Sequence, residues 1–345
     1  MTPTPANWFL GAPFIRDATD PWLTRFVPNA DHAFKFHIVP GSYSHDRSRK
    51  VTGLEQWKDL FQHGFALWNS ASQGPRPAGV LTCFPQLAIT VALRKQLAST
   101  NMPLVAWNFN LGKLYTGARR HLARGALGAV DRFIVHSRSE VHAYSEWLDL
   151  PASRFQFVPL QRAVRDITFE EEVQRPFLLS MGSAQRDYRL LFAVLAELGY
   201  PAVVVAGAHA VAGLSVPGNV EVRSGLSAEQ CFELVQRARL SVIPVANQDT
   251  ASGQVTLLEA MMYGRPVIIT SGPACLDYVT DRSDAILVRH GDHEDMKQAI
   301  QQLWEDEGLR AAIGRAARQT SIEKYSDEAI GRLMGQVLRE VGLAR

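Results

Sequence analysis

A polar loop and the helix expected after it hold the residues best suited to bind a charged ligand. The loop begins at Asp249 and the helix is predicted over Gln254–Tyr263. A glycine before the helix lets the backbone approach a ligand closely, and the first amides of a helix suit a diphosphate. These amides belong to Gly253, Gln254, Val255 and Thr256. Further along, Glu259 can accept two hydrogen bonds from a ribose diol. The segment Asp249–Thr270 therefore predicts a nucleotide site.

A second cluster follows the strand predicted over Pro176–Met181. Gly182 and Ser183 form a turn, and Arg186 stands at the start of the next predicted helix. A cation in that place can neutralise the charge that develops on a departing nucleoside diphosphate. Arg189, one turn further on, is expected to be a surface residue.

Two further strand ends are candidates for the same site. Gly207 follows a buried strand predicted over Ala202–Ala206, and Arg223 ends the next strand. Arg223 either stacks on or hydrogen bonds the base of a nucleotide, or it is simply exposed at a strand end.

The helix and strand around Glu259 resemble the family-4 glycosyltransferases of the GT-B fold (glycosyl transferases group 1). The hallmark of that family is Glu-Ala-Met on a helix followed by Gly-x-Pro-Val-Ile, and here it is Glu259-Ala-Met and Gly264-Arg-Pro-Val-Ile. The specific match covers roughly residues 176–288. The resemblance implies that Glu259 binds the donor's ribose hydroxyls and that the amides from Gly253 to Thr256 contact its diphosphate or sugar.

Three departures from the family pattern affect the expected site. The family often has a sugar-facing Glu at the position of Ala251, and Asp249 could replace it only with a differently shaped loop. Ser183 stands where relatives place an Arg, so Arg186 should carry most of the cationic role. Many relatives have a His near the reacting carbon, where this chain offers Asn108 or Asn110. The expected catalytic set is thus Arg186, Glu259 and Asn108.

Short apolar runs alternate with helical periodicity along the chain, which predicts parallel strands joined by crossover helices. In the first half, strands are predicted over 78–83, 103–107, 132–136 and 154–158, and helices over 86–98, 112–127 and 139–148. In the second half, strands are predicted over 176–181, 202–206, 220–223, 240–244, 266–270 and 285–288, and helices over 186–198, 228–239 and 254–263. The expected fold class is α/β, with two facing doubly wound, Rossmann-like domains in a GT-B architecture.

The domain boundary is expected in the segment 159–175, where strand patterning lapses. Residues 1–160 should form an acceptor-binding domain and residues 161–325 a nucleotide-sugar-binding domain. Residues 326–345 should form a helix that packs back toward the N-terminal domain.

The first half of the chain is basic. The whole chain has 36 Lys and Arg against 34 Asp and Glu, whereas residues 1–160 have 17 against 10, and none is acidic between Leu60 and Val130. This pattern favours an anionic partner, either a membrane surface or a charged acceptor, but solvated helix faces are an equal alternative. A basic amphipathic helix is expected over Lys113–Arg124.

Several patterns bear on location and metal use. Residues 1–6 lack the features of a signal peptide, and no stretch is apolar enough to span a bilayer. The three cysteines have no paired spacing. The protein is expected in the cytoplasm, at the inner face of the membrane, with no nucleic-acid partner and no cofactor. No Asp-x-Asp triplet is present, and the acidic and histidine residues from His290 to Asp295 are explained by helix capping, so no metal site is expected.

The resemblance implies a metal-independent, retaining glycosyltransferase. It would move a sugar from a UDP- or GDP-sugar to a glycan or lipid-linked acceptor, in bacterial polysaccharide or cell-envelope synthesis. An epimerase of nucleotide sugars with the same fold and a non-catalytic sugar-nucleotide-binding subunit remain alternatives, the latter favoured by Ala251 and Ser183.

Overall fold

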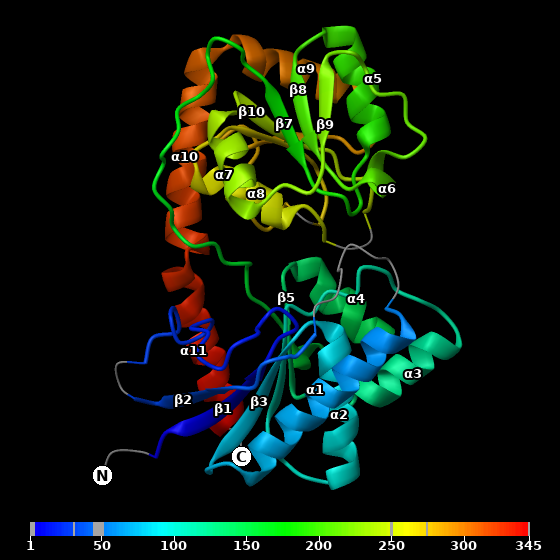
Figure 1. The fold of residues 1–345 in the computed structure, drawn as a ribbon, viewed down its shortest axis with the longest axis vertical. Helices are drawn as coiled ribbons and strands as arrows, with labels where there is room; N and C mark the ends of the chain where they lie inside the picture. Colours follow the sequence, from blue (N-terminus) through cyan, green and yellow to red (C-terminus); the bar gives the residue numbers. More distant parts are fainter. Residues whose placement is uncertain (1–3, 30–31, 44–51, 249–250, 274, 344–345) are drawn as a thin grey trace. The chain divides into compact units, whose positions relative to one another are not determined.

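The computed structural model describes residues 4–29, 32–43, 52–248, 251–273 and 275–343. The chain forms two compact units. Unit 1 comprises Met1–Pro159 and Ile330–Arg345, and unit 2 comprises Leu160–Ala329. Each unit contains a six-stranded sheet whose strand pairs are all parallel (Figure 1). The helix α11 (Asp327–Leu343) begins in unit 2 and continues in unit 1.

The sheet of unit 1 has the strand order β2-β1-β3-β4-β5-β6. Its strands are β1 (Ala6–Gly11), β2 (Phe34–Ile38), β3 (Ala78–Cys83), β4 (Leu104–Trp107), β5 (Arg132–Val135) and β6 (Phe155–Phe157). The crossover helices are α1 (Leu54–Gln73), α2 (Pro85–Ala98), α3 (Ala118–Leu127) and α4 (Arg138–Leu148).

Both faces of this sheet are covered. Because side chains alternate along a strand, Leu104 joins the core under the crossover helices while Val105 joins the core on the opposite face. That second core is closed by α11, which contributes Ile330, Met334 and Val337. Coverage on both sides explains why the central strands are almost wholly apolar.

The sheet of unit 2 has the order β12-β11-β10-β7-β8-β9. Its strands are β7 (Leu178–Met181), β8 (Ala202–Val205), β9 (Val220–Arg223), β10 (Leu240–Ile243), β11 (Val267–Thr270) and β12 (Ile286–Val288). Its helices are α5 (Tyr188–Leu198), α6 (Ala208–Val211), α7 (Ala228–Arg237), α8 (Gln254–Met262), α9 (His293–Glu305) and α10 (Glu307–Tyr325).

The helices of unit 2 also cover both faces of their sheet. Helices α5 and α9 pack on one face, and α7 and α8 pack on the other. Strand β11 serves both cores, since Ile268 faces the first and Val267 and Ile269 face the second. The prediction of an α/β chain with two doubly wound parallel sheets is therefore confirmed.

In unit 1, three elements were missed and the start of one predicted helix was wrong. The strands β1 and β2 and the helix α1 were not predicted. The helix expected to begin at Gly112, with its basic face from Lys113, begins only at Ala118. Gly112 and Gly117 have φ values of +65° and +67°, a left-handed backbone that interrupts a helix. Within α3, only Ala126 and Leu127 are buried.

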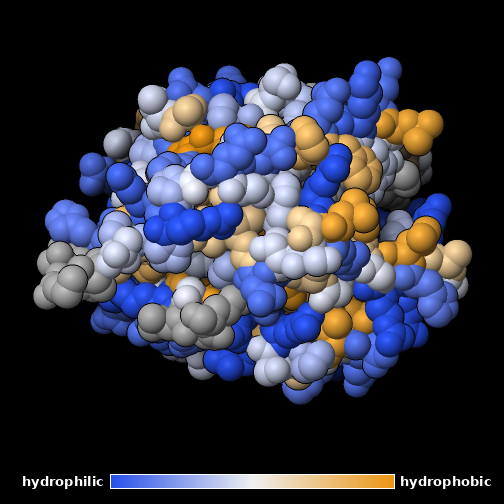
Figure 2. All heavy atoms as spheres, turned by 90° about the horizontal axis from the view of Figure 1, so that it is seen from below, coloured by the Kyte–Doolittle hydropathy of each residue, from blue (hydrophilic) through white to orange (hydrophobic). Residues whose placement is uncertain are grey.

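The surface mixes hydrophobic and hydrophilic side chains, as one face of the molecule shows in Figure 2. Leu122 on α3 is 74% exposed, and Phe61 and Phe65 on α1 are each 44% exposed. Among the described residues, no helix has the length and hydropathy needed to cross a membrane.

The docking of α11 on unit 1 can be tested with two glycines of that helix. A Cβ atom at Gly331 would lie 1.9 Å from the backbone oxygen of Phe26, whereas one at Gly335 would meet nothing closer than 3.5 Å. We expect Gly331→Ala to destabilise unit 1 by about 1–3 kcal/mol, because backbone must move. Gly335→Ala should be neutral or stabilising by up to about 1 kcal/mol, through helix propensity. Calorimetric melting of both variants provides the measurement; equal melting temperatures would contradict this packing.

Candidate functional site

The strand order of unit 2 creates a switch point between β7 and β10. These strands are neighbours in the sheet, but the chain runs outward from β7 through β8 to β9 and from β10 through β11 to β12. Ligands of doubly wound sheets bind outside the carboxyl ends of the strands at such a point. The predicted clusters after β7 and after β10 therefore lie together at one candidate site.

Backbone pairing joins the two sides of the switch point, both within the strands and in the segments that follow them. The β7–β10 ladder pairs Leu178 with Leu240 and Leu179 with Ser241. Beyond the strands, the chain turns back after β7, so that Arg186 forms an antiparallel bridge with Val245, which follows β10. Two backbone hydrogen bonds accompany this bridge, from Asp187 N to Pro244 O (2.8 Å) and from Ala246 N to Gln185 O (3.1 Å). We call this pairing of residues 185–187 with residues 244–246 the switch-point clasp.

Arg186 is held inside the turn by three hydrogen bonds. Its Nε donates to Met181 O (3.2 Å), its Nη1 to Ala184 O (2.8 Å) and its Nη2 to Thr256 Oγ1 (3.2 Å). Burial lowers the pKa of this guanidinium from its usual value, although an arginine stays charged at any ordinary pH. Its positive charge therefore lies against the first turn of α8.

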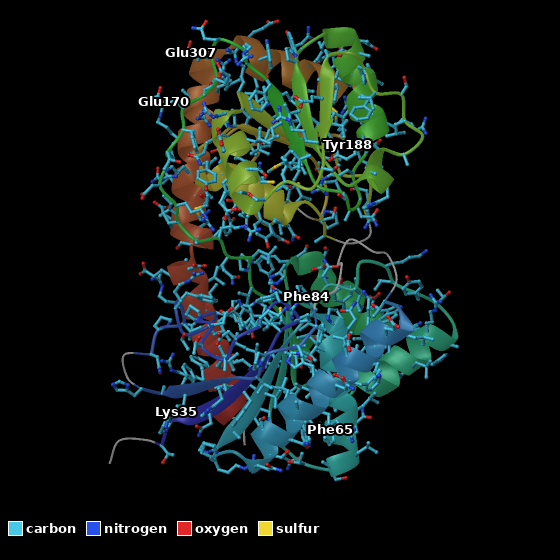
Figure 3. The ribbon with its side chains drawn as sticks, viewed as in Figure 1. Lys35, Phe65, Phe84, Glu170, Tyr188 and Glu307 are labelled. Carbon is cyan, nitrogen blue, oxygen red and sulfur yellow. The ribbon has the colours of Figure 1, made fainter. Side chains whose placement is uncertain are left out.

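Gly182 makes room for that guanidinium. Its φ is +117°, and a Cβ atom there would lie 2.6 Å from Arg186 Nη2. The glycine is anchored from the other side, because Tyr188 Oη donates to its backbone oxygen at 2.6 Å. Tyr188, labelled in Figure 3, is buried at the start of α5. Only glycine fits this position.

The first turn of α8 begins at a glycine N-cap. Gly253 has a φ of +92° and supplies no side-chain cap, while its backbone oxygen accepts from Leu257 N and from Thr256 Oγ1, each at 2.9 Å. Gln254 is buried and Val255 is 52% exposed. The positive end of the helix dipole and the Arg186 charge thus coincide, an arrangement that favours an anion.

Glu259 lies on α8 one turn after Thr256, and its side chain is 12% exposed. Its Oε2 is 3.2 Å from Arg162 Nε. Burial raises the pKa of the Glu259 carboxyl, and the charges of Arg162 and Arg165 oppose that rise. Sequence reasoning missed Arg162, because it lies in the segment assigned as a linker, where no motif marks it.

The remaining donor-site candidates of unit 2 lie at neighbouring strand ends. Ser183 Oγ accepts a 2.7 Å hydrogen bond from Gly207 N, which joins the ends of β7 and β8. Arg223 pairs with Glu221 through two hydrogen bonds of 2.7 and 2.8 Å, and this pairing raises the pKa of its guanidinium. Asp249 lies outside the described residues.

Asn108 belongs to unit 1 and has a φ of +50°. The structure places its Oδ1 2.6 Å from His136 Nε2 and its Nδ2 3.1 Å from Cys83 Sγ, although the two amide atoms are interchangeable in placement. The other ring nitrogen, Nδ1, is 2.7 Å from Val158 O and must donate to it, since a carbonyl only accepts. In the neutral ring, Nε2 is then an acceptor, so we assign Asn108 Nδ2 to the His136 side. Sequence reasoning gave His136 no role.

The histidine and acidic residues after β12 form a helix start. Asp292 accepts from Asp295 N at 2.9 Å as the N-cap of α9, and Asp295 accepts from Arg289 N at 2.7 Å. The capping interpretation is confirmed for Asp292. In the described part of the chain, no group of three or more His, Cys, Asp or Glu residues is arranged to hold a metal ion.

Comparison with known proteins bears on unit 2 directly. Residues 190–320 match the family model described as "Glycosyl transferases group 1". Unit 2 thus carries a glycosyl transferases group 1 segment. The resemblance that the sequence suggested is confirmed at this level, while the narrower assignment to family 4 stays a prediction.

A curated relative gives a local match. Poly(ribitol-phosphate) alpha-N-acetylglucosaminyltransferase from Staphylococcus aureus (strain COL) is 37% identical over 79 residues, which is 22% of this chain and 16% of the relative. The match therefore spans a small part of that protein's length.

Solved structures give the fold of the whole chain. Sucrose-phosphate synthase from Thermosynechococcus elongatus has a TM-score of 0.74 at 16% identity, with 99% of this chain and all of that one covered. Anabaena HepE in complex with UDP has a TM-score of 0.67 at 12% identity, with 97% and 100% covered. At this identity the likeness concerns the fold, and it confirms the predicted GT-B fold class.

The state of His136 gives a prediction for unit 1. Burial lowers the pKa of His136 from 6.5 to about 4. On acidification, His136 binds a proton in the unfolded chain at a higher pH than in the folded chain. This group therefore makes unit 1 less stable as pH falls from 6.5 toward about 4.

The tautomer of His136 can be tested directly. We expect nitrogen-15 NMR at pH 6 to show a neutral ring with hydrogen on Nδ1. Asn108→Asp places a carboxylate beside Nε2 and should raise the His136 pKa; hydrogen on Nε2 in the wild type would contradict the assignment.

Proposed function

We propose that this protein is a retaining glycosyltransferase that transfers a sugar from a nucleoside diphosphate sugar, UDP- or GDP-linked, to a glycan or lipid-linked acceptor. The observation that carries the proposal is the convergence at one switch point of the Gly182 turn, the Arg186 guanidinium and the first turn of α8. The family match over residues 190–320 supports it.

In this proposal the first turn of α8 and the turn after it hold different parts of the donor's nucleotide. The amides from Gly253 to Thr256 bind the diphosphate, and the Glu259 carboxylate accepts hydrogen bonds from the ribose hydroxyls. Gly182, Ser183 and Gly207 line the turns beside it, and Arg223 contacts the base. The exposed fraction of Arg223, 37% of its side chain, leaves that residue accessible to a base.

The leaving diphosphate is stabilised by charges of the protein itself. Arg186 and the helix dipole both face the position where negative charge develops as the glycosidic bond breaks, and fixed charges of this kind lower the barrier without a bound metal. We propose metal-independent transfer on this ground. Turnover that survives excess EDTA is the expected result.

The acceptor is assigned to unit 1, and the reaction to front-face attack. In that mechanism, the acceptor hydroxyl attacks the anomeric carbon from the side that the diphosphate leaves, and a phosphate oxygen takes its proton. Asn108 is proposed to contact the substrate from the end of β4. The contacts of the Asn108 side chain with His136 and Cys83 hold it in one position, so it would be pre-positioned for the substrate.

The relatives support this substrate class without fixing it. HepE was solved with UDP, with UDP and glucose, and with UDP-glucose, and the curated relative is named for transfer of N-acetylglucosamine to poly(ribitol phosphate). We propose by analogy a role in bacterial polysaccharide or cell-envelope glycan synthesis, at the cytoplasmic side of the membrane.

The donor site is tested with Glu259→Ala and Arg186→Gln, with Arg189→Gln as the matched control on an exposed arginine of α5. Loss of a charged hydrogen bond to ribose should weaken UDP or GDP binding by about 1.5–3 kcal/mol in Glu259→Ala. Arg186→Gln should lower kcat by about 100-fold or more, since it removes transition-state charge stabilisation. Arg189→Gln should match the wild type in both calorimetric binding and turnover.

The same assays separate the proposal from other functions of this fold. Normal turnover in Glu259→Ala would refute the donor assignment. A new nucleotide sugar formed without acceptor would indicate an epimerase. Binding of nucleotide without transfer or hydrolysis of any sugar donor by the wild type would indicate a non-catalytic subunit.

A peripheral membrane contact is proposed for α3. Arg119 is exposed there beside Leu122, and Leu122 is 74% exposed. We expect the wild type to sediment with vesicles of phosphatidylglycerol and to release at high salt, because the attraction is electrostatic. Arg119→Gln with Leu122→Ser should reduce the bound fraction severalfold, whereas Arg189→Gln should not. Equal binding to neutral phosphatidylcholine vesicles would count against the proposal.

A further inference from the structure

Arg162 is the third residue of unit 2 and the partner of the proposed ribose ligand. It belongs to the segment that leaves unit 1 at Pro159, and neither the family match nor the donor-site motifs include it. Its guanidinium lies 3.2 Å from Glu259 Oε2, with 31% of the arginine side chain and 12% of the glutamate side chain exposed.

The backbone of this segment is fixed independently of the side chain. Arg162 N donates to Tyr325 O at 2.8 Å, and Arg162 forms a parallel bridge with Ser326. Two residues earlier, Leu160 N donates to Tyr278 Oη at 3.0 Å, and Tyr325 Oη donates to Tyr278 O at 2.6 Å. Both tyrosines are buried. The arginine therefore reaches Glu259 from a rigid support.

The contact leaves the carboxylate free to accept hydrogen bonds. Arg162 Nε approaches Glu259 as an ion pair but does not meet hydrogen-bond geometry. Within the described residues, no other side chain is paired with this carboxylate as an ion pair. Hydroxyl groups of a ligand can thus bind the lone pairs without displacing the arginine.

Among the described residues, other ionisable groups also lie near Glu259 and Arg162. Arg165, on the same segment as Arg162, also favours the charged carboxylate, while its guanidinium stacks on the Phe232 ring. Burial, and after it the charge of Glu259, raises the pKa of the Cys231 thiol on α7 and of the Tyr263 hydroxyl at the end of α8. Burial lowers the pKa of Arg162, and the charges of Glu259 and of Asp327, at the start of α11, oppose that shift.

We propose that Arg162 is a positioning residue that keeps the Glu259 carboxylate ionised and oriented to bind ribose. The proposal rests on the proposed function, in which Glu259 holds the ribose diol of a nucleotide. Arg162 itself touches no substrate in this arrangement. A buried carboxylate that loses its cation takes up a proton at higher pH, and a protonated carboxyl accepts fewer hydrogen bonds.

The experiment measures how strongly the chain prefers a ribose over a deoxyribose nucleotide at each pH. The probes are UDP with 2′-deoxy-UDP and GDP with 2′-deoxy-GDP, titrated calorimetrically from pH 5 to 9; the pair that binds more tightly is used. In the wild type at pH 8, we expect the ribonucleotide to bind about tenfold more tightly or better. Arg162→Gln should move the pH at which this preference is half lost upward by about 1 unit or more.

Three variants show that the effect passes through Glu259. Arg175→Gln makes the same charge change at an exposed site of the same segment and should leave the pH midpoint unchanged. Glu259→Gln should abolish the preference at every pH, and adding Arg162→Gln to it should change nothing further. Arg162→Lys keeps the positive charge and should remain close to the wild-type midpoint. If Arg162→Gln does not fold, Arg162→Met, which retains the apolar stem, replaces it.

The outcomes separate this inference from the proposed function. A wild type without ribose preference, or a Glu259→Gln variant that keeps it, refutes the proposed function. If both behave as expected but Arg162→Gln has the wild-type midpoint or binds the ribonucleotide more tightly, only the positioning role is refuted. A midpoint that shifts equally in Arg162→Gln and in Arg175→Gln would likewise refute it, because the effect would then come from net charge alone.

Discussion

The candidate site depends on the switch-point clasp, the backbone pairing of residues 185–187 with residues 244–246. Strands β7 and β10 are paired only at two positions of their ladder, so their following loops would otherwise be independent. The hydrogen bonds from Asp187 to Pro244 and from Ala246 to Gln185 join those loops. As a result, the Arg186 guanidinium and the start of α8 are held in one position by main-chain geometry rather than by long flexible side chains. Such pre-organisation places charge where it is needed without reorganisation during the reaction.

Helix α8 carries groups of opposite charge in successive turns. Its first turn combines the helix dipole with Arg186, an arrangement that favours anions, whereas Glu259, one turn later, is a largely but not fully buried carboxylate paired with a cation of its own. Arg162 supplies that cation from outside the family segment, at the point where the chain enters unit 2. Without it, the same burial that shields the carboxylate from water would favour its neutral form.

Much of unit 2 could be predicted from sequence, because its strands are short, apolar runs bounded by glycine and proline. Strand β9 was predicted with its observed ends, and α8 with its observed start. Unit 1 was harder: β2 has one buried residue, Phe34, and no clear apolar run, whereas β1 contains the apolar run Trp8-Phe9-Leu10 and was still not predicted. Arg162 could not be predicted, since its partner is 97 residues away in sequence and the contact exists only in the folded unit.

In the proposed donor site, the sequence describes the nucleotide end better than the sugar end. The groups proposed to contact the diphosphate are backbone amides and Arg186, and these are positioned by the clasp and by the left-handed Gly253. The position where relatives often place a sugar-facing Glu holds Ala251, which is 5% exposed and therefore faces the protein interior. An acidic side chain at that buried position would lose its hydration. In the proposed function, contacts to the sugar would come from side chains other than that of residue 251, and these are set by local side-chain chemistry rather than by the fold.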